Sequence, residues 1–248
     1  MKRKYTWKPD LPDHRDYAYV AKKTISLPPL VDLRITYTTV YDQGQLGSCT
    51  GNSISMTIDM QRVKQGLAPM KPSRLFIYYN ERAMEGSIGE DSGAQIRDGI
   101  KSVSKIGYCP EAEWPYKITK FKTKPAKKCY TDAAQNLVKQ YSRINNTVLD
   151  DLKSVLASGF TFVFGMTVYE SFESAKVAKS GMVPMPSKKE KSLGGHAVCC
   201  VGYDDSKQCF IVRNSWGKSW GDGGHFYLPY AYITNTNLAD DFWTIRLI

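Results

Sequence analysis

One cysteine, Cys49, lies in a glycine-rich turn over residues 43–52, with the sequence QGQLGSCTGN. A thiol attacks an electrophile only as the thiolate, and a free cysteine with a pKa of about 8.5 is mostly protonated at neutral pH. Ser48 is suited to cap a helix that begins at Cys49, which would place the sulfur near unpaired N–H groups at the positive end of the helix dipole. The turn therefore predicts a nucleophilic cysteine whose pKa is lowered.

A histidine is the expected partner of this thiol, and the chain contains three histidines. His196 follows two glycines and opens an apolar run over 197–202 that is typical of a buried strand. Asn214 ends a second apolar run, and Trp216 lies two residues further on. We expect Asn214 to orient the imidazole of His196 and Trp216 to shield their hydrogen bond. Each residue taken alone is also typical of an ordinary buried core group.

Together these motifs resemble the papain and cathepsin family of cysteine peptidases. The resemblance rests on Gln43 six residues before the cysteine, the Gly-Ser-Cys turn, Gly-His-Ala-Val and Asn-Ser-Trp-Gly. The intervals are 196 − 49 = 147 and 214 − 49 = 165 residues, where the family places His and Asn about 130–150 residues after the cysteine. The likeness covers residues 27–248, and 27–34 resemble the amino terminus of the mature enzymes.

The resemblance implies that the protein is an endopeptidase and assigns roles within the site. Cys49 attacks the peptide carbonyl, His196 protonates the leaving amine, and Asn214 fixes the imidazole ring. The Gln43 side-chain amide and the Cys49 N–H hold the oxyanion. Five further residues are expected to bind substrate along the cleft walls: Ser92, Gly93, Gly195, Ala197 and Trp216. Thr50 departs from the family, which has an aromatic residue there.

Two other functions remain open. The same groups catalyse acyl transfer to amines, so the protein is alternatively an acyltransferase or transamidase. The net charge of +10 and the pI of about 9.2 also suit a non-catalytic protein that binds an acidic partner. Much of that charge falls in lysine-rich stretches at 117–124, 127–128 and 188–191 that are typical of solvated loops. Without a nucleic-acid motif, we expect a peptide or protein substrate and not a nucleic acid.

The six cysteines form no CxxC pairs, which argues against zinc. No metal and no cofactor are expected. Leu46 occupies the position where secreted relatives carry a disulfide cysteine, which indicates a reducing compartment. The amino terminus lacks the apolar core of a secretory signal, and no stretch has the length of a membrane span. We therefore expect a cytoplasmic or otherwise non-exported protein that does not contact a membrane.

The expected fold class is α+β. Helices are predicted from Ser48 to Gln65, after Ser73, after a Ser92 cap as far as Gly107, and over 148–156. Short apolar strands at 160–168, 197–202, 210–213 and 226–228 dominate the second half. The resemblance implies a papain-like peptidase domain over 27–248. It comprises a helical lobe at about 35–125 and a β-barrel-like lobe at about 126–235, with a cleft between them.

Residues 1–26 precede this domain as a polar arm that includes Trp7, Pro9, Pro12 and Tyr17. Prolines favour extended backbone and aromatic side chains provide anchors, which suits a strand-like ligand in a peptide groove. The arm is therefore a candidate for self-inhibition. The alternative is an arm that packs on the body with a structural role.

Overall fold

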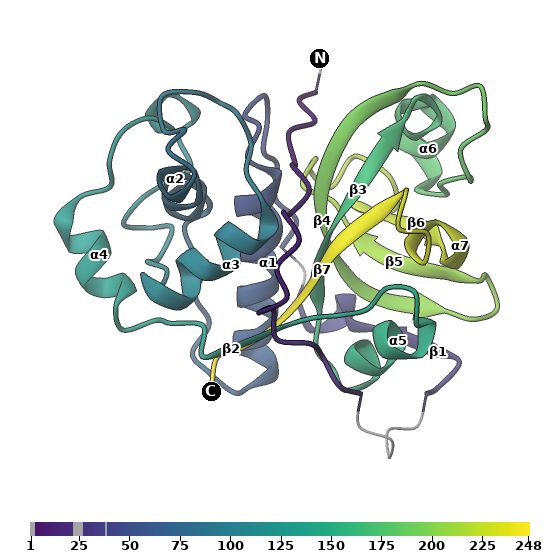
Figure 1. The fold of residues 1–248 in the computed structure, drawn as a ribbon, viewed down its shortest axis with the longest axis horizontal. Coiled ribbons are helices and arrows are strands. Elements are labelled where there is room, and N and C mark those ends of the chain that lie inside the picture. The colour runs from purple at the N-terminus through teal and green to yellow at the C-terminus, as the bar shows by residue number, and fades with distance from the viewer. Residues whose placement is uncertain (1–2, 22–26, 38) are drawn as a thin grey trace.

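The computed structural model describes residues 3–21, 27–37 and 39–248. These residues form an α+β fold with two lobes side by side (Figure 1). The helical lobe contains α1 (Cys49–Lys64), α2 (Arg74–Met84), α3 (Ile96–Lys105) and α4 (Lys127–Ala133). The other lobe is built on one sheet. No helix among the described residues combines the length and the apolar character that crossing a membrane requires.

The sheet is antiparallel, with the strand order β2-β7-β3-β4-β5-β6 and with β1 paired to β4. Its strands are β1 (Leu30–Asp32), β2 (Gln140–Arg143), β3 (Phe162–Tyr169), β4 (Ser192–Asp204), β5 (Cys209–Arg213), β6 (His225–Pro229) and β7 (Ala239–Arg246). Around it lie α5 (Leu149–Ala157), α6 (Ala175–Ser180), α7 (Tyr230–Ile233) and the 3-10 turns Leu33–Thr36 and Glu170–Glu173. The 3-10 turn Ile118–Lys120 belongs to the helical lobe and lies near Gly44. Within the described chain the strand order runs from edge to edge without closing into a barrel.

β4 extends further toward the amino terminus than the predicted strand. Apart from Leu193, its first residues are serine and glycine, but Gly194 and Gly195 pair with Val168 and Thr167 of β3. The backbone ladder continues there because glycines pair as well as apolar residues do, although they carry no apolar signal. His196 therefore lies inside a long paired strand and not at its beginning.

The helix α1 confirms the prediction of a helix from Ser48 to Gln65, although its apolar residues alternate as they would in a strand. It packs against α2 and α3 on one side and against β4 on the other. Small residues permit this close packing: a methyl group on Gly51 would lie 2.7 Å from the carbonyl oxygen of Arg74. α1 is therefore the helix through which the two lobes meet.

The predicted helix after Ser73 is confirmed as α2, which Ser73 caps by accepting a hydrogen bond from Phe76 N–H at 3.1 Å. The predicted cap at Ser92 is wrong. α3 begins at Ile96, after Gln95, and the Ser92 hydroxyl donates to Ser87 instead. Gly93, at φ +68°, turns the chain between Ser92 and the helix, so the serine cannot reach the first helical N–H groups.

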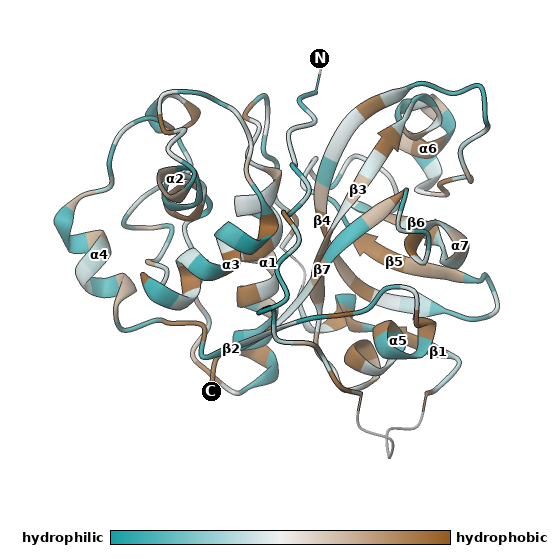
Figure 2. Ribbon diagram, viewed as in Figure 1, coloured by the Kyte–Doolittle hydropathy of each residue, from teal (hydrophilic) through white to brown (hydrophobic). Residues whose placement is uncertain are grey.

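One hydrophobic cluster joins the lobes. It includes Ile54 and Ile58 of α1, Ile100 of α3, and Val163 and Trp243 of the sheet. Within the sheet lobe, β5 is hydrophobic over much of its length, whereas α4 is mostly hydrophilic (Figure 2). The packed contact between the lobes holds the walls of the site at a fixed separation.

We predict that Gly51→Ala destabilises the protein. Alanine gains up to about 1 kcal/mol of helix propensity over glycine, whereas overpacking a core costs about 1–3 kcal/mol. The clash at 2.7 Å is with a backbone oxygen that cannot rotate away. The cost of overpacking should therefore exceed the gain in helix propensity, by about 1–2 kcal/mol. Denaturant unfolding measures the change. Gly89→Ala is the control, because nothing lies within 4 Å of its methyl position. Equal unfolding free energies for the two variants would contradict this account of α1.

Candidate active site

Cys49 is the first residue of α1 and is fully buried. Burial raises the pKa of its thiol to about 11, although the nearby Ala197 backbone and Thr6 side chain oppose that shift. The predicted lowering of this pKa is therefore wrong for the chain with its arm in place. Ser48 precedes the helix but makes no side-chain cap. Its hydroxyl instead hydrogen-bonds Tyr116.

His196 is held by Asn214. Nε2 of the imidazole lies 2.9 Å from Asn214 Oδ1, and the same oxygen accepts the Ser215 N–H at 2.8 Å. Since this oxygen can only accept, Nε2 carries the proton and Nδ1 is the basic nitrogen. Nδ1 has no hydrogen-bond partner among the described residues. Burial lowers the pKa of His196 to about 4, so the ring is neutral at pH 7.

Trp216 covers this pair. Its ring stacks on the imidazole of His196 with centroids 5.1 Å apart and an interplanar angle of 25°. Phe172 and Trp220 meet Trp216 edge-on from behind. The indole therefore covers one face of the imidazole, which is the position that the predicted shielding role requires.

Gln43 is fixed by Ser215, a residue that the sequence analysis did not single out. Ser215 Oγ donates to Gln43 Oε1 at 2.5 Å, and the Gln43 main-chain N–H donates to the Ser215 carbonyl at 2.9 Å. Gln43 Nε2 donates one hydrogen to the Leu46 carbonyl at 3.0 Å, so its second N–H remains available. The position of Ser215 between Asn214 and Trp216 was the signal that could have revealed this role.

Three of the predicted wall residues, Gly93, Gly195 and Trp216, contact the arm. The Trp7 N–H donates to the Gly195 carbonyl at 3.0 Å, and the Lys8 N–H donates to the Ala94 carbonyl at 3.3 Å. The Thr6 carbonyl lies over Gly93, where a methyl group would come within 1.8 Å of it. Ala197 packs in the same hydrophobic cluster as Cys49 and Trp7. The side chain of Ser92 does not join this group and contacts Ser87.

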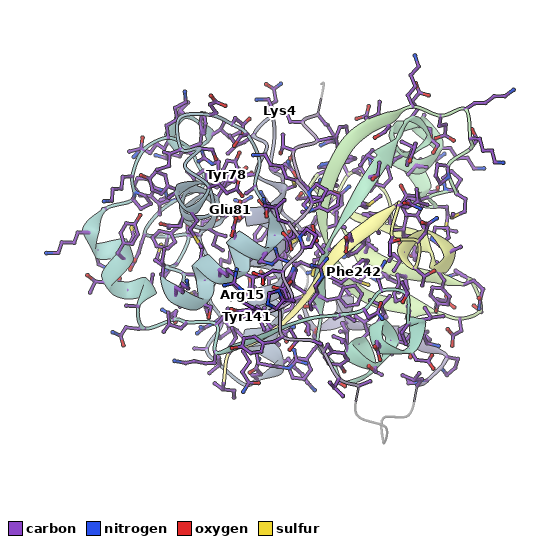
Figure 3. All side chains as sticks on the ribbon, viewed as in Figure 1. Lys4, Arg15, Tyr78, Glu81, Tyr141 and Phe242 are labelled. Carbon is purple, nitrogen blue, oxygen red and sulfur yellow. The ribbon has the colours of Figure 1, made fainter. Side chains whose placement is uncertain are left out.

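The arm is an extended segment between the walls. Thr6 bridges Gly195 and Lys8 bridges Gln95, both in parallel orientation. Figure 1 shows the amino-terminal segment running down between the helices and the sheet, and Figure 3 places Lys4 and Arg15 along the same boundary. Residues 1–2 and 22–26 of the predicted arm lie outside the described residues.

Trp7 makes the deepest contact. Its side chain is only 8% exposed and packs over Gly165, where a methyl group would overlap the indole at 2.0 Å. It belongs to the same hydrophobic cluster as Cys49 and Ala197. The Thr6 hydroxyl, next to it, donates to the Gly47 carbonyl at 2.7 Å. The arm therefore fills the space over the thiol.

Residues before Thr6 reach the histidine side of the site. The guanidinium of Arg3 lies 4.0 Å from the ring centroid of Trp216. Tyr5 meets His196 edge-on, with centroids 6.2 Å apart, and its hydroxyl hydrogen-bonds Glu173. Lys4 pairs instead with Asp91 at 2.5 Å on the helical-lobe side, where Asp91 also accepts the Gly47 N–H. Arg3 and Tyr5 therefore complete the cover over the imidazole.

Residues after Lys8 anchor the arm to the body. Asp10 accepts the Arg97 backbone N–H and the Trp243 indole N–H, each at 3.0 Å. Its own N–H donates to Asp241 at 2.7 Å. Asp16 forms a buried ion pair with Arg97. The anchor is therefore polar and buried, in contrast to the apolar contact of Trp7.

The other histidines lie elsewhere. His225 Nε2 accepts from Arg213 Nε at 3.0 Å, and burial lowers the pKa of His225 to about 4. His14 is exposed on the arm. His196 is accordingly the histidine that the fold brings to the Cys49 region.

Comparison with known proteins assigns this chain to a protein family. The model for the papain family of cysteine proteases matches residues 27–243. Xylellain, a cysteine protease from Xylella fastidiosa, superimposes with a TM-score of 0.93 at 46% identity, over 98% of this chain and 96% of that one. An uncharacterized peptidase C1-like protein of Acanthamoeba polyphaga mimivirus is 49% identical over 83% of this chain and 68% of its own length. Cysteine proteinase 1 of Entamoeba histolytica is 30% identical, and the match covers 81% of this chain and 63% of that enzyme.

We predict that Cys49 in the intact chain is alkylated slowly at neutral pH. With a pKa raised to about 11, the reactive thiolate is scarce at pH 7 and increases about tenfold per pH unit. Mass spectrometry of the peptide that contains Cys49, after timed exposure to iodoacetamide between pH 6 and 10, measures the profile. Free cysteine under the same conditions is the control. A plateau at Cys49 below pH 8 would show that the thiol is already ionised.

Proposed function

We propose that this chain, which belongs to the papain family of cysteine proteases, hydrolyses peptide bonds with Cys49, His196 and Asn214. The observation that carries the proposal is the 2.9 Å contact between His196 Nε2 and Asn214 Oδ1. It leaves Nδ1 as the free basic nitrogen of a histidine whose next residue, Ala197, packs in the same hydrophobic cluster as Cys49. A base and a thiol are thus held on adjoining elements.

In the proposed reaction, His196 Nδ1 takes the proton of the Cys49 thiol, and the sulfur attacks the substrate carbonyl carbon. The same proton passes to the leaving amine as the C–N bond breaks, which leaves a thioester. Neutral His196 then takes a proton from water, and hydroxide attack releases the acid and restores the thiol. Asn214 holds the ring through both steps.

The oxyanion that forms in each step needs donors. We assign this role to the second N–H of Gln43 Nε2 and to the Cys49 N–H, at the start of α1. Ser215 and the Leu46 carbonyl hold the Gln43 amide in one orientation. Donors fixed in this way stabilise charge without reorganising during the reaction.

We propose that the substrate is an extended peptide that takes the place of the arm. Gly195 and Ala94 supply the carbonyls that bind arm N–H groups. Gly93 supplies the close approach that a side chain would block. Any substrate backbone in the same groove has these acceptors available. Trp216, which stacks on His196, forms the end of this groove on the histidine side.

The arm itself is proposed to inhibit the enzyme. It occupies the acceptors on both walls, and Thr6 meets Cys49 through its side chain while its carbonyl faces Gly93. Because the arm is covalently attached, its effective concentration is about millimolar. Residues 27–248 would then be the peptidase domain, and the segment before them its regulator.

The cellular location stays a proposal. All six cysteines are free thiols in the structure, which agrees with a reducing compartment such as the cytoplasm.

We predict a graded loss of activity among the proposed catalytic residues. Cys49→Ala and His196→Ala should each lower kcat/KM by about 10⁴-fold or more. Gln43→Ala should cost about 10²–10³-fold, and Asn214→Ala should leave measurable turnover because the base itself remains. Hydrolysis of a fluorogenic peptide measures the series, with Cys209→Ser as the control. Full activity in His196→Ala would place the base elsewhere.

We also predict that Trp7→Ala activates the full-length chain. A buried tryptophan contributes about 3–5 kcal/mol, and each 1.4 kcal/mol is a tenfold change in an equilibrium constant, so the open state should increase by tenfold or more. The rate on a short peptide should rise accordingly, as should that of a variant beginning at Leu27. Leu11→Ala is the matched control, since this arm side chain is 71% exposed. An unchanged rate with a lower melting temperature would show that the arm is structural.

A further inference from the structure

Three metal-ligating side chains meet in the helical lobe, outside the cleft. The Sγ atoms of Cys109 and Cys129 and a carboxylate oxygen of Glu113 all lie within 4.8 Å of one another. Cys109 and Glu113 lie in the segment that follows α3, and Cys129 lies in α4. Two chain segments that are separate in sequence thus bring together two thiols and one carboxylate.

The surroundings do not account for the carboxylate. Cys109 and Cys129 belong to an apolar cluster with Leu75, Phe76 and Trp114, so two buried thiols alone would be ordinary core groups. Glu113 is half-buried, and its Oε1 accepts from Lys128 Nζ at 2.6 Å. Its Oε2 is buried without a hydrogen-bond partner among the described residues. A buried unpaired carboxylate oxygen costs free energy unless something charged or polar meets it.

We propose that Cys109, Cys129 and Glu113 bind a thiophilic divalent cation of the zinc class, with water as the fourth ligand. Two thiolates and one carboxylate are ligands that zinc takes in tetrahedral sites. Zinc–sulfur bonds of about 2.3 Å and zinc–oxygen bonds of about 2.1 Å place ligand atoms roughly 3.6–3.8 Å apart. Side-chain shifts of about 1 Å are enough to close a site of the present size.

Charge balance supports the same ligand. Ordinary cysteine thiols are mostly protonated at neutral pH, and a metal binds them as thiolates. Binding of one divalent cation therefore replaces two S–H protons, which leave to solvent, and the carboxylate that pairs with Lys128 becomes the third ligand. The bound site carries two thiolates and one carboxylate against the two charges of the cation. Lys128, paired with Glu113 and Asp132, offsets the remaining negative charge.

The site lies behind the catalytic turn. The Ser73 N–H donates to the Cys109 carbonyl at 2.8 Å, and the Ser73 hydroxyl donates to the Trp114 carbonyl at 2.6 Å. Two residues beyond Trp114, the Tyr116 hydroxyl donates to the Gln43 carbonyl at 3.0 Å. A cation that ties α4 to this segment would therefore stiffen the support of the turn that carries Cys49.

The test uses the full chain with Cys49→Ala, which removes the active-site thiol as a competing ligand. Protein that has been stripped with a chelator under reductant is titrated with zinc ion against a chromophoric chelator, and proton release is followed in weak buffer. We expect one zinc per chain, two protons released per zinc, and a higher melting temperature. Binding should weaken about 100-fold for each pH unit below neutrality, because two protons compete with each ion.

In the Cys49→Ala chain, the further change Cys129→Ser should weaken zinc binding by at least about 100-fold. Loss of a group that only supports a metal ligand already lowers metal affinity by about 10–100-fold. Glu113→Gln, at a half-buried position that tolerates the change, should weaken binding without unfolding the protein. Cys209→Ser is the matched control and should bind as the background does. Equal zinc affinity in Cys129→Ser and Cys209→Ser would overturn the proposal. So would an unreduced chain 2 Da lighter with the 109 and 129 peptides linked, because the pair would then be a disulfide.

Discussion

The carbonyl oxygen of Asn214 can only accept hydrogen bonds, and this constraint arranges the rest of the site. It fixes the proton of His196 on Nε2 and leaves Nδ1 basic. The neighbouring residues act around that bond. Ser215 holds Gln43 by two hydrogen bonds, and Trp216 stacks on the imidazole. Three consecutive residues therefore hold the proposed base, hold the proposed oxyanion donor and cover the imidazole. They can do so because β4 and β5 are neighbours in the sheet.

Burial has a second consequence for the chemistry. It raises the pKa of Cys49 and lowers the pKa of His196, and both shifts favour the neutral pair over thiolate and imidazolium. The positive charge of Arg3, a residue of the arm, lowers the pKa of His196 further. Desolvation disfavours whichever form is charged. The arm accordingly opposes catalysis twice in our proposal, by occupying the groove and by keeping water away from the groups that must ionise.

Much of the fold and the site could be predicted because it rests on local signals. Predicting α1 as a helix required weighing the length of the segment and its small residues against apolar residues that alternate as in a strand. The prediction that Ser92 caps α3 was wrong because the left-handed turn at Gly93 separates the serine from the helix. The beginning of β4 was missed because glycines carry no apolar signal. Ser215, the Asp10 anchor and the approach of Cys109 to Cys129 depend on contacts between distant segments, which sequence spacing does not encode.

The two halves of the arm are held by different forces, and this affects how the proposed inhibition would be relieved. Substrate competes only for the backbone acceptors and the space that Trp7 occupies. It has no counterpart for Asp16, whose buried ion pair with Arg97 involves side chains that are 10% and 5% exposed, or for the contacts of Asp10. Removing one partner of such a buried pair typically costs about 3–5 kcal/mol, and the substrate offers no contact in exchange for it. The anchor should therefore stay bound when substrate displaces the segment near Thr6, and the arm would return to the cleft as each product leaves.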